Sequence, residues 1–314
     1  MSDKIINDKF ELIDCPVCEK NSHKPYFSVP YGDLKQKSSL DYSSLGVCRE
    51  TVLYVKKCRW CDFIFVNPRV KPEFASLIYN ESKKNMYINN PSLKEPWTAE
   101  YKAKNRVSTI NSFRQLLAIL NRQNGNCNLK FLDYGTGFGK SMSLAEHFGI
   151  ESYGIDVDRE RLGACEKMNL KVSTPEKFDA KYPGIKVDMI LMQNCIEHLI
   201  DLPAAMSFIA EHSNTGALVW INGLLPRIIS IEKKKKKFVK AHFIEHVNYF
   251  SIKTLDYMFF KYGFKPVNTI FSSSTARIVT NFNDLKSLII DILIPLRIRT
   301  YTETTFNRIY EYNA

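Results

Sequence analysis

From residue 128 onward, short apolar runs alternate with segments whose apolar positions recur every three or four residues. The short runs fit buried strands, and the periodic segments fit amphipathic helices. Strands that alternate with helices are typical of right-handed β-α-β units and a mostly parallel sheet. The predicted strands are 130–133, 152–155, 189–192 and 218–221, and the predicted helices are 140–147, 159–168, 202–212 and 252–262.

Two further apolar runs, 267–271 and 276–280, are joined by a short serine loop. Such a short connection predicts a hairpin and therefore an antiparallel edge on the sheet. The fold class expected from these patterns is α/β, with a Rossmann-like, doubly wound, mostly parallel sheet and an antiparallel edge strand. We assign this domain to residues 128–284 and treat 285–314 as a C-terminal extension.

The first 80 residues follow neither pattern, because they are rich in aromatic residues and cysteine and have little helical period. We assign residues 1–80 to a small N-terminal module, with strand-like runs at 51–55 and 63–66. Between the two domains, Val107, Ile110 and Phe113 begin an apolar stripe that predicts a helix over 106–122. Residues 81–127 are therefore expected to form a helical connector.

The composition of the 314 residues is 45% hydrophobic and 25% charged, which excludes disordered, collagen-like and disulfide-scaffold proteins. No apolar run reaches the length of a membrane span, and the N-terminus lacks the apolar stretch of a signal peptide, so we expect a cytoplasmic protein. The net charge of +11 favours anionic partners, and Lys233–Lys237 carry part of it. Those partners include phosphorylated small molecules, nucleic acid and an acidic membrane surface, so peripheral membrane contact stays open.

Four of the eight cysteines form two Cys-x-x-Cys pairs, Cys15 with Cys18 and Cys58 with Cys61, separated by 39 residues. Two such pairs supply the four thiolates of a closed, structural zinc site, and a zinc ribbon with an inserted loop accommodates the long spacing. The alternative is a group of four reduced, buried cysteines without metal.

The sharpest motif is FLDYGTGFG at 131–139, where a strand runs directly into a helix. Glycines at alternate positions permit a tight turn and close approach of a ligand to the backbone. The third glycine comes one residue too early for a dinucleotide fingerprint, and Asp133 would repel a pyrophosphate. That carboxylate suits a ligand with positive charge, and Asp156 after the next strand can accept hydrogen bonds from ribose hydroxyls. Together these features indicate a nucleoside-type cofactor.

The stretches LDYGTGFG, YGIDVD and DMILMQNCIEHL resemble the class I S-adenosylmethionine-dependent methyltransferases. HVNYFS before the last helix resembles one branch of them, and CRWCDFIFVNPR resembles the zinc-binding module that this branch often carries. The branch is frequent among enzymes that methylate sugars of surface polysaccharides or their nucleotide-linked precursors. The resemblance covers roughly residues 12–80 and 128–270.

The resemblance implies that S-adenosylmethionine binds with its methionine part over Asp133, Gly135 and Gly137. It implies that the ribose lies at Asp156 and the adenine near Val157. The full set of implied cofactor-binding residues is Asp133, Gly135, Thr136, Gly137, Gly139, Asp156, Val157, Glu176, Gln193 and Asn194.

Residues 224–250 are too long for a plain connection and are predicted to form a lid over the acceptor, with the lysine run attracting a diphosphate. Within the lid, His242 and His246 are four residues apart and would share one face of a helix. An imidazole is suited to remove a hydroxyl proton near neutrality. The resemblance favours His246 over His242 as this catalytic base, while either could instead pack the lid. Glu197 and His198 could act in catalysis or cap the following helix.

The sequence therefore predicts methyl transfer to an oxygen or a carbon of a sugar, with an anionic sugar derivative as the small-molecule acceptor. One alternative is a nucleic-acid methyltransferase that uses the basic surface and the zinc module, although the chain has no aromatic RNA-binding motif. Another is a cofactor-binding scaffold without enzymatic activity. The sequence leaves the acceptor sugar, the methylated position and the oligomeric state open.

Overall fold

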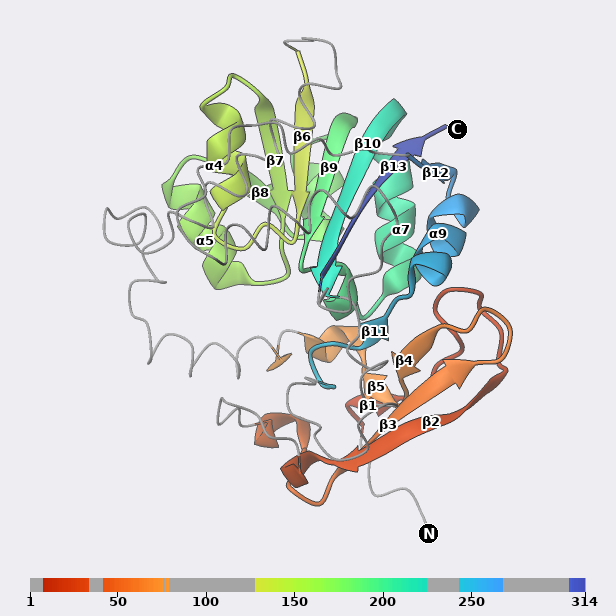
Figure 1. The fold of residues 1–314 in the computed structure, drawn as a ribbon. Helices are drawn as coiled ribbons and strands as arrows, with labels where there is room; N and C mark the ends of the chain where they lie inside the picture. The colour runs from red at the N-terminus through yellow and green to blue at the C-terminus, as the bar shows by residue number, and fades with distance from the viewer. Residues whose placement is uncertain are drawn as a thin grey trace, which may run out of the picture.

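The computed structural model describes residues 8–33, 42–75, 77–78, 128–224, 243–267 and 305–313 (Figure 1). The predicted helix over 106–122, the lysine run at 233–237 and His242 lie outside these ranges, as does almost all of the predicted hairpin at 267–280. Within the described ranges, no helix is both long enough and apolar enough to cross a membrane.

A seven-stranded sheet, in the order β12-β13-β10-β9-β6-β7-β8, forms the centre of the larger domain. Its neighbours from β10 through β9, β6 and β7 to β8 pair in parallel, whereas β13 pairs antiparallel with β10 and β12. This arrangement confirms the predicted Rossmann-like fold with an antiparallel edge. The strands are β6 (Lys130–Tyr134), β7 (Glu151–Ile155), β8 (Lys171–Ser173), β9 (Val187–Gln193), β10 (Ser213–Leu224), β12 (Phe264–Pro266) and β13 (Thr305–Tyr312).

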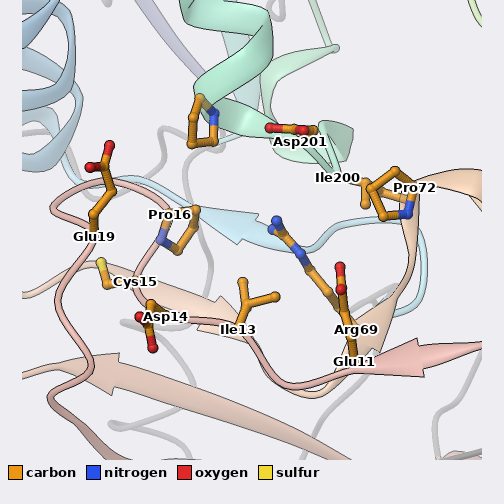
Figure 2. Close-up of a pocket in the computed structure, with 11 residues that line it drawn as sticks. Glu11, Ile13, Asp14, Cys15, Pro16, Glu19, Arg69, Pro72, Ile200 and Asp201 are labelled. Atoms are coloured by element: carbon orange, nitrogen blue, oxygen red, sulfur yellow. The ribbon is translucent and has the colours of Figure 1, made fainter.

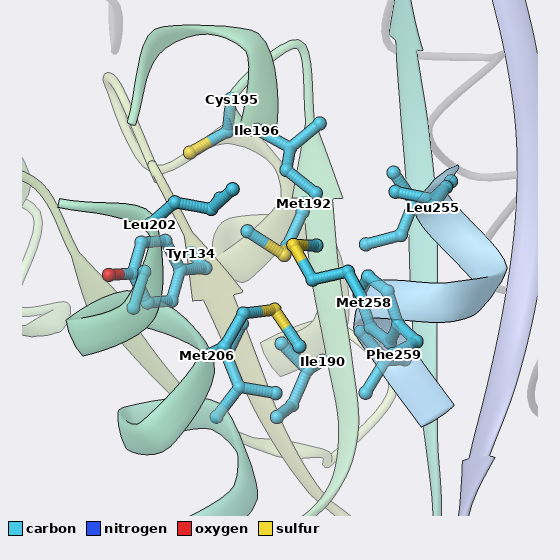
Figure 3. Close-up of a cluster of buried hydrophobic side chains, with 14 of the residues drawn as sticks. Tyr134, Ile190, Met192, Cys195, Ile196, Leu202, Met206, Leu255, Met258 and Phe259 are labelled. Carbon is cyan, nitrogen blue, oxygen red and sulfur yellow. The ribbon is translucent and has the colours of Figure 1, made fainter. Parts of the chain in front are cut away.

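Helices cover both faces of this sheet. They are α4 (Lys140–Glu146), α5 (Arg159–Lys167), α6 (Phe178–Lys181), α7 (Leu202–Glu211) and α9 (Ile252–Lys261), with 3-10 turns η6 (Pro175–Lys177) and η7 (Ile196–His198). Because side chains alternate along a strand, Ile190 of β9 packs with α7 and α9, whereas Met189 packs with α4 and α5. Figure 3 shows the first of these two cores, where Met192, Met206 and Met258 meet beneath Cys195.

The antiparallel edge arises differently from the expectation. Val267 lies just beyond β12 and outside any strand, and the structure forms the edge with β13, from the segment that the sequence analysis assigned to an extension. Arg308 and Tyr310 of β13 both donate to the carboxylate of Asp256 on α9, at 2.6 and 2.7 Å. This charge-assisted network anchors the last strand to the helix that packs beside it.

The N-terminal module contains a two-stranded sheet, β1 (Phe10–Glu11) with β5 (Arg69–Val70), and a four-stranded antiparallel sheet in the order β11-β4-β3-β2. Its other elements are β2 (His23–Pro30), β3 (Val52–Cys58), β4 (Ile64–Val66), η1 (Tyr31–Asp33), η2 (Ser43–Leu45) and η3 (Pro72–Phe74), and β11 is Asn248–Tyr249. The fourth strand of this sheet therefore comes from the segment before α9, and Asn248 pairs with Phe65. The described end of the predicted lid, 243–250, thus packs against the N-terminal module.

Candidate cofactor and acceptor site

The loop between β6 and α4 is held against the end of β7 by backbone hydrogen bonds. The amides of Gly135 and Thr136 both donate to the Ile155 carbonyl, at 2.8 and 2.9 Å. Gly135 has a φ of +81°, and a Cβ there would lie 2.7 Å from the Cys195 sulfur, so no larger residue fits. Gly139, at the N-cap of α4, closes the loop.

Gly137 differs from Gly135 because a Cβ at this position would meet nothing within 4 Å. Its φ of +58° is a left-handed conformation that favours glycine. Its amide donates to Asp156 Oδ2 at 2.9 Å, so the turn is fixed while the space beside it is open. A ligand can therefore approach the backbone closely at this point of the loop.

Asp133, at the end of β6, is a buried carboxyl group with an altered acidity. Its pKa is raised to about 7, mainly by burial and also by the nearby charge of Asp156, while the hydroxyl of Thr136 opposes the shift by donating to Oδ2 at 3.2 Å. The charge of Lys140 also lowers this pKa, and a cation that binds beside the carboxylate would stabilise its ionised form in the same way. Asp133 thus suits a positively charged ligand.

Asp156 directly follows β7, and backbone amides orient its carboxylate. Oδ2 accepts from Gly137 and Oδ1 accepts from the Asp158 amide, both at 2.9 Å. Val157 beside it is 40% exposed, which offers an apolar surface next to a hydrogen-bond acceptor. This combination matches the edge of a ribose and the face of a base. Glu176, in η6 after β8, is exposed.

The end of β9 completes the same edge of the sheet. Gln193 is the last residue of β9, and Asn194 follows with a φ of +48° and donates its amide to the Asn222 carbonyl at 2.6 Å. Cys195 then packs against Gly135, and burial raises the pKa of its thiol well above the usual value. The carboxyl ends of β6, β7 and β9 therefore meet, as expected of a ligand site in a parallel α/β sheet.

A second group of polar side chains lies just beyond β9. One ligand-type atom from each of Glu197, His198 and His246 lies within 4.8 Å of the others. The rings of His198 and His246 are 4.4 Å apart between centroids and meet edge to face at 78°. Glu197 is only 3% exposed, and its carbonyl accepts from the Val247 amide at 2.9 Å.

The helix expected through His246 is not present, because 243–245 form a turn and His246 has irregular backbone. Asn248 explains the position of this segment, since its side-chain amide donates to the Ile196 and Leu199 carbonyls at 3.2 and 2.6 Å. The predicted partner of His246 was His242, which lies outside the described residues, and the structure brings His198 to it instead. The sequence analysis named Glu197 and His198 as candidates, but no local pattern indicated that His198 contacts His246.

The four cysteines of the two Cys-x-x-Cys pairs converge in the N-terminal module. Their sulfurs all lie within 4.8 Å of one another, with Cys15 to Cys61 and Cys18 to Cys58 each at 3.5 Å. Each pair is followed by a residue with positive φ, Glu19 at +59° and Asp62 at +62°, so both turns have the same form. Four sulfurs at this spacing fit tetrahedral coordination of zinc with Zn–S bonds of about 2.3 Å.

A family model described as "Methyltransferase domain" matches residues 102–269, more than half of the chain. No curated protein sequence matches significantly. Similar solved structures include magnesium protoporphyrin IX methyltransferase from Synechocystis PCC 6803 with bound SAH (14% identity, TM-score 0.48, covering 77% of this chain and 100% of that one). A second is the plantazolicin methyltransferase BamL with a triazolic desmethylPZN analog and SAH (15% identity, TM-score 0.47, covering 77% of this chain and 94% of that one). A third is a SAM-dependent methyltransferase from Archaeoglobus fulgidus (18% identity, TM-score 0.40, covering 63% of this chain and 94% of that one).

Proposed function

The chain belongs to the methyltransferase-domain family and is an enzyme, and we propose that it transfers a methyl group from S-adenosylmethionine to a sugar. The observation that carries the cofactor assignment is the loop at 135–139 with Asp133 below it and Asp156 beside it. The sulfonium and ammonium groups of S-adenosylmethionine supply the positive charge that the buried Asp133 carboxylate favours. The open side of Gly137 leaves room for the methionine part of the cofactor.

In this proposal the ribose hydroxyls donate to Asp156 and the adenine lies on Val157, with Glu176 at its edge. Gly135, Thr136 and Gly139 shape the loop, and Gln193 and Asn194 border the reacting methyl group at the end of β9. The acceptor then enters beyond β9, where Glu197, His198 and His246 gather. This order of binding regions follows the carboxyl edge of the sheet.

The acceptor hydroxyl loses its proton to His246 as its oxygen attacks the methyl carbon. When bound, S-adenosylmethionine would supply this methyl carbon: its carbon–sulfur bond would break with the electron pair moving to sulfur, which would give the methyl ether and neutral S-adenosylhomocysteine. A positioned base contributes about 10²–10⁴-fold to such a step, and alignment of the two substrates contributes about 7–11 kcal/mol. His242 is the alternative base, and a carbon acceptor would need the same proton removal.

Zinc bound by Cys15, Cys18, Cys58 and Cys61 is the second cofactor that we propose. The spacing of the four sulfurs supports this assignment, and four protein ligands leave no position for water, so the metal would be structural. It would fix the turn after β3 and the loop after β1, and through them the N-terminal module that pairs with β11.

The sugar class rests on the resemblance of the N-terminal module and of HVNYFS to enzymes that methylate surface polysaccharides. The same proposal includes the domain boundaries at 80, 127 and 284. It also includes a lid at 224–250, whose lysine run attracts a diphosphate. The net charge of +11 keeps nucleic acid as the second candidate acceptor.

Mass spectrometry of glycans and nucleotide-sugar pools, from cells with the wild-type protein and with the Asp156→Ala variant, tests this proposal. One added methyl group on a defined sugar, present only with the wild-type protein, is the expected result. Methylation of RNA or DNA in the same cells, without a change in any sugar, would overturn the sugar assignment.

A further inference from the structure

Besides the four cysteines, one group of metal-type ligands gathers in the described part of the chain, namely Glu197, His198 and His246. Each residue offers one ligand atom, and these atoms all lie within 4.8 Å of one another. Carboxylate and imidazole ligands lie about 2.0–2.2 Å from a zinc-type ion, so two ligands of one ion are at most about 4 Å apart. Small rotations of the three side chains would therefore close the cluster around an ion.

Backbone contacts hold the two segments of this cluster against each other. The Val247 amide donates to the Glu197 carbonyl at 2.9 Å, directly beside His246. The side chain of Asn248, which is 1% exposed, donates to two carbonyls in and just after η7, at 3.2 and 2.6 Å. Adjacent residues of a helix do not normally face each other, and here His246 lies within reach of both Glu197 and His198. The ligands are thus positioned by the fold before any ion binds.

The charge and the chemistry of the cluster suit a divalent transition-metal ion. Glu197 brings a carboxylate into a site that is 3% exposed at this residue, and buried carboxylates are paired or coordinate metals. Imidazole nitrogens favour zinc, iron and nickel, whereas magnesium and calcium favour oxygen ligands. We propose that Glu197, His198 and His246 bind one divalent transition-metal ion.

Other carboxylates near the cluster in sequence face elsewhere. Asp201 lines a separate cavity of about 280 Å³, with the buried Arg69 across from it (Figure 2). It also caps α7 by accepting from the Ala204 amide at 3.0 Å. Within the described residues the ion therefore has three protein ligands, which leaves at least one coordination position for water. This differs from the four cysteines, which fill a tetrahedral site.

Binding of the ion has a consequence for His246. A neutral imidazole has one nitrogen with a lone pair, and its other nitrogen carries a hydrogen. When the lone pair binds a metal, the ring has no basic nitrogen left to take a proton from the acceptor. The ion is therefore an inhibitor of methyl transfer. This consequence rests on the proposed function, whereas binding of the ion does not.

Calorimetric titration of the full-length, zinc-loaded protein with Co²⁺ and with Mg²⁺ tests the site. One equivalent of Co²⁺ is expected to bind at least tenfold more tightly than Mg²⁺. The visible spectrum should lack the sulfur-to-metal charge-transfer bands that Co²⁺ on the cysteines would give. His198→Asn should weaken Co²⁺ binding at least tenfold, or about 1.4 kcal/mol. His147→Asn, which removes an exposed histidine, is the matched control and should leave the affinity unchanged.

Glu197→Gln keeps the shape of the side chain and removes its charge, so it replaces His198→Asn if that variant does not fold. It should weaken Co²⁺ binding to a similar extent. Absence of Co²⁺ binding, or an affinity that is the same in the wild type and in both variants, would overturn the site.

The rate of methyl transfer separates this site from the proposed function. With an acceptor identified by the mass-spectrometric survey, Co²⁺ should inhibit the wild type at the concentrations that fill the site, and a chelator should restore the rate. An unchanged or increased rate with the site filled would refute His246 as the base and leave the metal site standing. Loss of activity in His246→Ala without any Co²⁺ binding by the wild type would refute the metal site alone.

Discussion

Replacing Asp133 by Asn removes the buried charge that we assign to the cationic cofactor. With a pKa of about 7, Asp133 is about one-tenth ionised at pH 6 and about nine-tenths ionised at pH 8. If only the ionised form binds S-adenosylmethionine well, the wild-type affinity rises roughly tenfold between these pH values, or about 1.4 kcal/mol. The variant should bind weakly at both.

Calorimetry from pH 6 to pH 8 measures this difference. The amino group of the cofactor titrates in the same pH region, with a pKa of about 7.7–8.0 for an α-amino group. The test therefore compares how the affinity changes with pH in the wild type and in Asp133→Asn. A variant with the same pH slope as the wild type, or with unchanged affinity at pH 8, would refute the reasoning.

The same carboxyl group links pH to the stability of the ligand-free protein. Its pKa is raised from 3.8 to about 7, so the folded state holds the proton more tightly than the unfolded chain does. The stability that this proton provides is fully present below pH 3.8 and is lost as pH rises to 7, in total about 4 kcal/mol. Urea unfolding between pH 5 and pH 8 should therefore give a shallower fall in stability for Asp133→Asn than for wild type.

Three further variants test the remaining assignments. Cys58→Ser should lose the zinc and lower the melting temperature, by the equivalent of about 4 kcal/mol when zinc is a thousandfold above its Kd. The control variant Cys48→Ser, at an exposed cysteine, should keep the zinc and the wild-type melting temperature. Elemental analysis that finds no zinc in the wild type would contradict this prediction. Gly137→Val should abolish cofactor binding in calorimetry, because the side chain would fill the open side of the loop. It should also cost about 1–2 kcal/mol of stability, because residue 137 has a left-handed φ. Normal affinity for the cofactor would show that the open side of the loop is not the cofactor site. His246→Ala should lower kcat about 10²–10⁴-fold and leave the affinity for the cofactor unchanged. The wild-type rate should fall at acid pH. Near-normal turnover by the variant would show that His246 has only a structural role.

The sequence by itself determined the elements that depend on neighbours along the chain. The predicted strand at 130–133 and helix at 159–168 match β6 and α5 to within one residue, because apolar period and capping are local. The glycine loop and Asp156 were identifiable for the same reason, since their chemistry follows from the ends of consecutive strands. The convergence of the two Cys-x-x-Cys pairs was also predictable, because the spacing within each pair forms its own turn.

Only the tertiary structure decided the long-range pairings. The pattern of 305–312 does not indicate that β13 lies between β10 and β12, and nothing near Asn248 indicates that it pairs with Phe65. Strand partners far apart in sequence are selected by the apolar surface that the whole fold leaves to be covered, and no local period records that choice. The contact of His198 with His246 and the burial of Arg69 both depend on the position of the segment 243–250 and of the N-terminal module. The chemistry of these residues could be read from the sequence, but the fold decided which of them meet.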